Sequence, residues 1–234
     1  MKNVPIKMVP DFMVIFNGEV RNDAYVNYNA YWNDIAVLVP IANDIMSGAS
    51  VTLTANIFTY DGTVKKPEVE SVIPTGGVTV LPKDCDLTYT DMSGNVVDPV
   101  NAGQYYVKTT LKGKGIYGGS IKKVFQINKA SNTMTAKGKK VKIKASKLRK
   151  KTLIVKPAKS LQICTAVGDL NFKLASVNKK KFKKFFKVDA GNGNVKIKKG
   201  LRKGNYKLKI NIKAAGDANY LAAARQVTVT IKVK

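Results

Sequence analysis

The chain has 234 residues, and its 41 lysine and arginine residues against 15 aspartate and glutamate residues give a net charge of +26. It contains no histidine, which removes the commonest general base and the usual activator of a nucleophile, and no unbroken apolar run approaches the length of a membrane span. We therefore expect a globular protein that is not an enzyme, has no cofactor and does not span a membrane.

The charge divides the chain into three parts. Basic and acidic residues number 3 and 5 in residues 1–48, 9 and 7 in residues 49–130, and 29 and 3 in residues 131–234. A chain of this length has room for two small domains. We predict an N-terminal docking or anchoring segment at 1–48, followed by one domain at 49–130 and a lysine-rich domain at 131–234.

Residues 1–48 carry six of the 19 aromatic residues, including the only tryptophan. Tyr25, Tyr28, Tyr31 and Trp32 are spaced so that a helical turn would place them on one side, and an irregular arm would also suit them. Three interpretations are open: the rings complete a core, which is the favoured one, they dock on a partner, or they stack on sugars. These four residues are the candidate docking surface.

The beginning of the chain does not have the pattern of a signal peptide. Lys7, Pro10 and Asp11 interrupt the sequence MKNVPIKMVPDFMVIF before an apolar core can form. We therefore expect no export signal in this sequence.

Beyond residue 49 the pattern is that of short strands. Apolar and polar residues alternate in YKLKINIKA (206–214), VTVTIKVK (227–234) and VKIKAS (141–146), which is typical of half-buried antiparallel strands. Turn signals such as DG, SGN, GNGN and RKGN separate these runs. The sequence therefore predicts an all-β protein with two tandem β-sandwiches.

Two blocks of sequence resemble known bacterial modules. The residues IFTYDGTVKKPEVE, and then NAGQYYVKTTLKGKGIYGGSIKKVFQI, resemble bacterial immunoglobulin-like modules over about Val51–Ala130. From Asn132 onward, GLRKGNYKLKI and AGDANYLAA are similar to lysine-rich immunoglobulin-like or cadherin-like modules of secreted proteins from Gram-positive gut bacteria. The resemblance implies immunoglobulin-like sandwiches that act as non-catalytic spacers or display modules on large surface proteins. Such domains can carry Lys–Asn isopeptide crosslinks, and the sequence leaves that possibility open.

Three further motifs have simpler interpretations. Gly113, Gly115 and Gly118 satisfy G-x-G-x-x-G, but a strand and not a helix follows them, so we expect a turn and no nucleotide site. Asp217 and Asn219 fall short of the six to eight oxygen ligands of calcium, and we expect an ordinary turn and no metal site. Cys85 and Cys164 fall in different predicted domains, which favours two structural thiols over a disulfide or metal cluster.

The stretch at 176–200 interleaves lysines with Phe182, Phe185 and Phe186. A groove for single-stranded nucleic acid would need such a mixture. We favour a β-hairpin whose connection is GNGN, with Val195 and Ile197 facing inward and the phenylalanines belonging to the core. The candidate basic surface consists of Lys179, Lys180, Lys181, Lys183, Lys184, Lys196, Lys198 and Lys199.

Three functional hypotheses follow. The first, which we favour, is a bacteriophage virion accessory protein, for capsid decoration or the tail, that is anchored in a larger assembly by residues 1–48 and holds weakly to anionic polysaccharide, teichoic acid or mucin through its lysines. The second is a bacterial cell-surface adhesin or a fragment of one. The third, a nucleic-acid-binding protein, is the least favoured. We expect a virion surface or an extracellular, bacterial cell-surface location, and a homo-oligomer is compatible with both.

Overall fold

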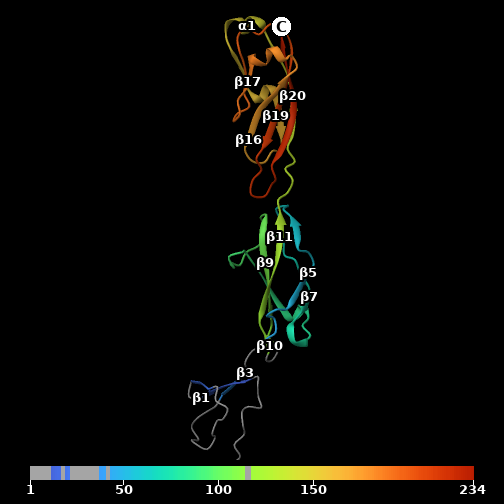
Figure 1. Ribbon diagram of the computed structural model, residues 1–234, viewed down its shortest axis with the longest axis vertical. Coiled ribbons are helices and arrows are strands. Elements are labelled where there is room, and N and C mark those ends of the chain that lie inside the picture. Colours follow the sequence, from blue (N-terminus) through green and yellow to red (C-terminus); the bar gives the residue numbers. More distant parts are fainter. Residues whose placement is uncertain (1–11, 17–18, 22–36, 41–42, 114–116) are drawn as a thin grey trace, which may run out of the picture. The chain divides into compact units, whose positions relative to one another are not determined.

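The computed structural model describes residues 12–16, 19–21, 37–40, 43–113 and 117–234, with side chains from Asp44 onward. Strands dominate and helices are short, so the protein is all-β, as the sequence predicts (Figure 1). The described chain divides into two compact units. The first contains the described residues up to Phe58 together with Val64–Ile127, and the second contains Thr59–Thr63 together with Asn128–Lys234.

The first unit begins with a small antiparallel sheet in the order β2-β1-β3. Val14 lies in its middle strand, opposite Arg21 on one side and Leu38 on the other. These strands fall inside the predicted N-terminal segment. Their bounds are β1 (Phe12–Phe16), β2 (Glu19–Arg21) and β3 (Val37–Pro40).

The remainder of the first unit is built around a four-stranded sheet in the order β6-β11-β9-β8. Strands β5 and β7 form a separate antiparallel pair, and β4 pairs with β10 in parallel. Two short 3-10 helices connect β7 to β8. The bounds are β4 (Asn43–Asp44), β5 (Ser50–Leu53), β6 (Ile57–Thr59), β7 (Val69–Ile73), η2 (Thr75–Gly77), η3 (Pro82–Asp84), β8 (Cys85–Thr90), β9 (Gly103–Leu111), β10 (Tyr117–Gly118) and β11 (Ser120–Asn128).

Phe125 lies near the centre of the first unit's core, and only 1% of it is exposed. Its ring stacks on Tyr105, with 5.7 Å between centroids, and meets Phe58 and Tyr89 edge-on. Aromatic pairs in these geometries contribute beyond the area that they bury. The first unit thus has its own apolar centre.

The second unit has two main sheets. A four-stranded sheet has the order β13-β20-β19-β16, a three-stranded sheet has the order β14-β18-β17, and β12 pairs with β15. The bounds are β12 (Thr135–Gly138), β13 (Lys140–Ile143), α1 (Ala145–Lys150), β14 (Leu153–Val155), α2 (Pro157–Ser160), β15 (Leu161–Cys164), β16 (Leu170–Val177), η4 (Lys180–Phe185), β17 (Phe186–Val188), β18 (Val195–Ile197), β19 (Gly204–Ala214) and β20 (Ala223–Val233).

Strand β19 shows how this sequence builds a sandwich. From Tyr206 to Ala214 every second residue is buried and every residue between is exposed. Leu208, Ile210 and Ile212 are fully buried, whereas the lysines of the strand lie on the outer face. Burial of aliphatic side chains drives the packing, and the lysines keep the other face hydrated.

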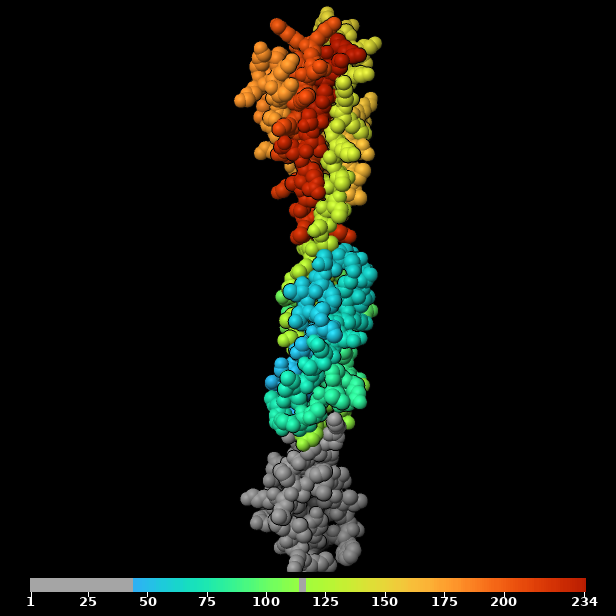
Figure 2. All heavy atoms as spheres, turned by 90° about the vertical axis from the view of Figure 1, so that its right-hand side faces the viewer, coloured from blue at the N-terminus to red at the C-terminus, as the bar shows by residue number. Residues whose placement is uncertain are grey.

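The prediction for residues 141–146 is wrong in two respects. Strand β13 ends at Ile143 and pairs with β20 in parallel, not antiparallel; Figure 2 shows the two chain segments side by side. From Ala145 the chain forms the helix α1 instead of a longer strand. Ala145 and Leu148 are both buried, and a helix places residues three apart on one face, so the helix lets both enter the core.

The predicted hairpin at 186–197 is confirmed. Strands β17 and β18 pair antiparallel, with Val188 opposite Val195, and the side chains of Val195 and Ile197 are fully buried. Gly193 has a φ of +68° and the ring of Phe172 lies against it, so a side chain there would be strained.

The two units share a topology. In sequence order, the first strand of each four-stranded sheet (β6 or β13) pairs with the fourth (β11 or β20). The fourth pairs with the third (β9 or β19), and the third pairs with the second (β8 or β16). In both units a tyrosine two residues into the third of these strands, β9 or β19, donates its hydroxyl to a carbonyl four residues earlier: Tyr105 to Asn101 and Tyr206 to Arg202, each at 2.9 Å. This tyrosine corner is a feature of immunoglobulin-like sandwiches.

Replacing Tyr206 with phenylalanine should lower the free energy of unfolding by about 1 kcal/mol, because the Arg202 carbonyl loses its hydrogen bond while the ring packing stays. Burial also raises the pKa of the Tyr206 hydroxyl, with the positive charge of Arg202 opposing the shift. This contribution to stability is therefore complete below the ordinary tyrosine pKa of about 10 and is lost as the pH rises through the raised value.

The measurement is urea unfolding of the wild type and Tyr206→Phe from neutral pH to above pH 10, because lysine and other tyrosine titrations occur in both proteins and cancel in the difference. The gap in stability should narrow at the alkaline end. A gap that is constant across the range would contradict the assignment. Tyr105→Phe is the matched change in the first unit.

None of the helices in the part of the chain that the structure describes has the length and apolar character required to cross a bilayer.

Candidate anion-binding surface

Three segments that are distant in sequence meet at one end of the second unit. The amide of Gly200 donates to the carbonyl of Leu148, and the amide of Lys198 donates to the carbonyl of Phe185, both at 2.9 Å. The amide of Lys199 also donates to the hydroxyl of Thr152 at 3.3 Å. Residues 144–151, 178–185 and 198–203 therefore form one surface, which we call the basic end.

The basic end contains many cations and no aspartate or glutamate. Every one of its lysine and arginine residues is exposed, and within the described residues no ion pair involves any of them. By contrast, Lys66 in the first unit pairs with Asp98 at 2.6 Å. The cations are Lys144, Lys147, Arg149, Lys150, Lys151, Lys179, Lys180, Lys181, Lys183, Lys184, Lys198, Lys199, Arg202 and Lys203.

Most of the predicted basic residues lie in this surface, and one does not. Lys196 is in β18, opposite Lys187, on the outer face of the three-stranded sheet. The basic surface predicted from the sequence did not include the cations of α1 and its flanks, or Arg202 and Lys203. Their charge was visible in the sequence, but only the pairing of the strands brings them beside residues 179–184.

The phenylalanines of this region belong to the fold. Phe186 is buried, and the half-buried Phe182 and Phe185 pack against the core. Phe182 lies 5.4 Å from the ring of the buried Tyr206. The ammonium group of Lys181 lies 5.7 Å from the centroid of Phe182 and that of Lys184 lies 5.9 Å from Phe185. Lysines therefore approach the rings that a stacking platform would leave open to bases.

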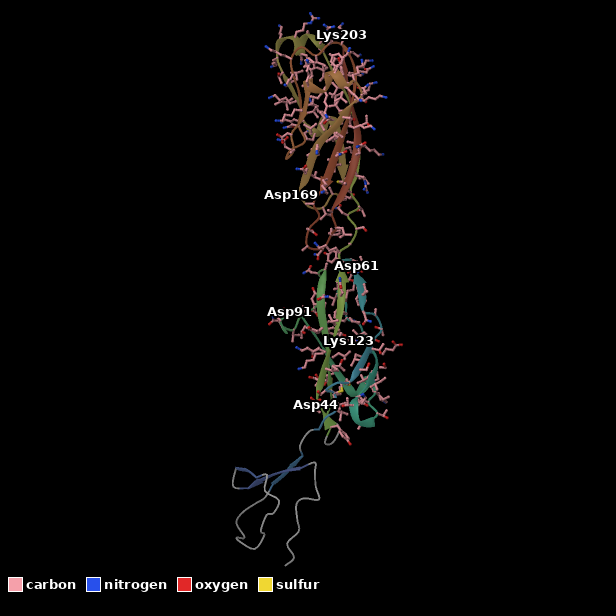
Figure 3. The ribbon with its side chains drawn as sticks, viewed as in Figure 1. Asp44, Asp61, Asp91, Lys123, Asp169 and Lys203 are labelled. Carbon is pink, nitrogen blue, oxygen red and sulfur yellow. The ribbon has the colours of Figure 1, made fainter. Side chains whose placement is uncertain are left out.

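The carboxylates of Asp189 and Asp217 in the second unit are engaged in turns. A carboxylate oxygen of Asp189 accepts the amides of Gly191 and Asn192, and one of Asp217 accepts the amides of Asn219 and Tyr220. The predicted turn at Asp217 is thus confirmed. Figure 3 shows Asp169 and Lys203 toward opposite ends of the unit, so the carboxylate does not offset the charge of the basic end.

The basic end is suited to charge attraction and not to a shaped ligand. Lysine is a hydrated point charge on a flexible side chain, whereas arginine binds phosphate or sulfate with two parallel hydrogen bonds. Only Arg149 and Arg202 are arginines in the basic end. Unpaired cations on one surface attract polyanions. We therefore treat the basic end as the candidate functional site.

The candidate docking residues Tyr25, Tyr28, Tyr31 and Trp32 lie outside the described residues. Their role stays a prediction.

The remaining candidates for special chemistry have structural explanations. Cys85 is buried, and burial, followed by the charge of Asp84, raises the pKa of its thiol; Cys164 is exposed, and both thiols are free. The prediction of two structural thiols therefore suits the buried Cys85 but not the exposed Cys164. The buried Asn132 side chain bonds the backbone of Met134 and Val167, which explains its burial without a crosslink. Within the described residues, no cluster of His, Cys, Asp and Glu could hold a metal ion.

Strand β11 follows Gly118, as predicted, and not a helix. The G-x-G-x-x-G match therefore lacks the helix that a phosphate site requires.

No protein-family model matches this chain, and no curated protein matches it. Among solved structures, extracellular domains 1–2 of human mucin-like protocadherin share 10% identity, with a TM-score of 0.37 over 79% of this chain and 98% of that one. Domains 1–3 of mouse clustered PcdhgC3 share 12% identity, with a TM-score of 0.37 over 95% of this chain and 75% of that one.

A SusE-like, surface-located polysaccharide-binding protein from the heparin utilisation locus of Bacteroides thetaiotaomicron shares 13% identity, with a TM-score of 0.31 over 79% of this chain and 34% of that one. Similarity at this level carries no conclusion about ligand or partner. The all-β fold rests on the strand order and the tyrosine corners described above.

Proposed function

We propose that this protein is a non-catalytic, surface-displayed adhesive protein that holds anionic polymers through its basic end. The observation that carries the proposal is the convergence of residues 144–151, 178–185 and 198–203 into one exposed surface with no acidic residue. A cationic surface of this kind raises the local concentration of polyanions. Added salt weakens the binding because it screens the charges. Anionic polysaccharide, teichoic acid and mucin are the partners of matching chemistry.

Competition for the immobilised protein tests this function. Heparin, teichoic acid and DNA should displace one another in the order of their charge density, and all should be released by added salt. Because Phe182 and Phe185 pack against the core, we expect no base to stack on them. Preference for one single-stranded nucleic acid, with quenched aromatic fluorescence, would support nucleic-acid binding and count against the proposal.

We place the protein on a virion as a capsid decoration or tail accessory protein, anchored by residues 1–48, with a bacterial cell-surface adhesin as the alternative. The support is the resemblance of both sandwiches to surface display modules and the aromatic, slightly acidic composition of residues 1–48. Co-purification of the chain with assembled particles, and its loss when residues 1–48 are deleted, is the expected result. Recovery with cell-wall fractions alone would favour the adhesin.

A further inference from the structure

A shallow hollow of about 410 Å³ lies on the second unit's four-stranded sheet, away from the residues of the basic end. Ligand pockets in proteins commonly have volumes of about 300–1,000 Å³, so this hollow has room for a small molecule. It is lined by Asn171, Lys173, Asn211, Ile212, Lys213, Ala224, Arg225 and Gln226.

Strand register explains why a hollow forms here. Asn171, Lys213 and Ala224 form one cross-strand row on the outer face of the sheet. Lys173, Asn211 and Gln226 form the next row. Ala224 carries only a methyl group among these longer side chains, and the space that it leaves becomes the floor of the hollow.

The polar groups around the floor are of two kinds. The amide of Gln226 donates to the side-chain oxygen of Asn211 at 2.8 Å, which fixes both amides while leaving each with further hydrogen-bonding capacity. Lys173 and Lys213 supply cations, and Arg225 donates to the carbonyl of Ala224 at 2.9 Å. No acidic residue lines the hollow.

We propose that this hollow binds a single anionic sugar residue of a longer glycan. Lys173 and Lys213 bind its carboxylate, sulfate or phosphate, and the amides of Asn171, Asn211 and Gln226 bind its hydroxyl groups. The inference rests on the proposed function, because it gives the anionic polymer a defined subsite in addition to diffuse attraction.

Side-chain amide resonances of the full chain provide the direct test. Glucuronate, glucose 6-sulfate and glucose 6-phosphate should shift the NH₂ signals of Asn171, Asn211 and Gln226, and their ranking identifies the preferred oxyanion. Neutral glucose and inorganic sulfate or phosphate should bind about tenfold more weakly, because each lacks one of the two kinds of contact. Equal shifts with inorganic anions, or shifts with none of the sugars, would overturn the proposal.

Ala224→Leu tests the shape of the site without changing its charge. Leucine fills the floor, and we expect binding of the preferred sugar acid to weaken at least about tenfold. Thr228→Leu is the matched control, since Thr228 is also exposed on β20 and lies opposite Lys209. Equal effects of the two changes would contradict the site.

The two proposals fail separately. Ala224→Leu should remove the sugar-induced amide shifts but keep most of the retention of the protein on heparin, because the basic end is intact. Neutralising lysines of the basic end should leave the sugar-induced amide shifts unchanged. If it removed those shifts, diffuse charge and not the hollow would account for the binding.

Discussion

Replacing Lys180, Lys181, Lys183 and Lys184 together with glutamine should weaken binding to heparin or teichoic acid by about tenfold or more. All four side chains are exposed, and within the described residues none has an acidic partner, so their whole charge is available to a polyanion. The slope of log affinity against log salt should become shallower, because fewer counterions are released on binding. Heparin-column elution and titration at several salt concentrations measure both effects.

The matched control replaces Lys140, Lys142, Lys187 and Lys209 with glutamine. These lysines are also exposed in strands of the second unit, and the change in net charge is identical. We expect a smaller loss of affinity in the control. Equal losses would show that net charge alone, and not the basic end, determines the binding.

Stability provides an internal check on this variant. Like charges crowded on one surface repel one another, so their neutralisation should leave the melting temperature unchanged or raise it. A fall in melting temperature would mean that the lysine stems support the rings of Phe182 and Phe185, and the loss of binding would then reflect local unfolding.

Local sequence patterns predicted the strands and their buried faces well. Alternation in residues 206–214 predicted β19, since one apolar residue in every two is enough to define a strand with one buried face. The GNGN connection predicted the β17–β18 hairpin because its geometry depends on residues within one short segment. Both are local signals.

The direction of β13 could not be predicted in this way. Lysines alternate with aliphatic residues in 140–143 whether the neighbouring strand runs parallel or antiparallel, and the partner β20 lies 90 residues later, with Lys140 opposite Thr230. The start of α1 at Ala145 could not be predicted either. A helix this short forms because Ala145 and Leu148 pack into the core, and that packing is not visible in the local sequence.

The candidate site was only half predicted for the same reason. The lysines at 179–184 are adjacent in sequence, but the rest of the basic end comes from α1 and from residues 198–203. One backbone hydrogen bond joins Gly200 to Leu148, and another joins Lys198 to Phe185. The hollow around Ala224 depends on the register of three strands. A one-residue shift would turn its amides and lysines to the buried face.

Replacing Phe125 with alanine should lower the unfolding free energy of the first unit by about 3–5 kcal/mol. The ring is 1% exposed and contacts Phe58, Tyr89 and Tyr105, so its removal leaves a cavity among aromatic side chains. Small domains are stable by about 5–15 kcal/mol in total, and the loss is a large part of that amount. Val124→Ala is the matched control, because Val124 precedes Phe125 in β11 but is 43% exposed, and we expect a change within about 0.5 kcal/mol.

The same variant tests our proposal that residues 49–130 and 131–234 are separate domains. Hydrogen exchange resolved by residue should show faster opening of β8, β9 and β11 in Phe125→Ala, while β19 and β20 keep their protection. Leu208→Ala, at a fully buried position of β19, should give the reverse pattern, at a cost of about 2–5 kcal/mol to the second unit. If either change lowered protection equally in both units, the two would unfold as one cooperative body and the division into domains would be wrong. The expected result is two independent transitions, because each unit has its own buried aromatic centre, at Phe125 in the first and at Tyr206 in the second.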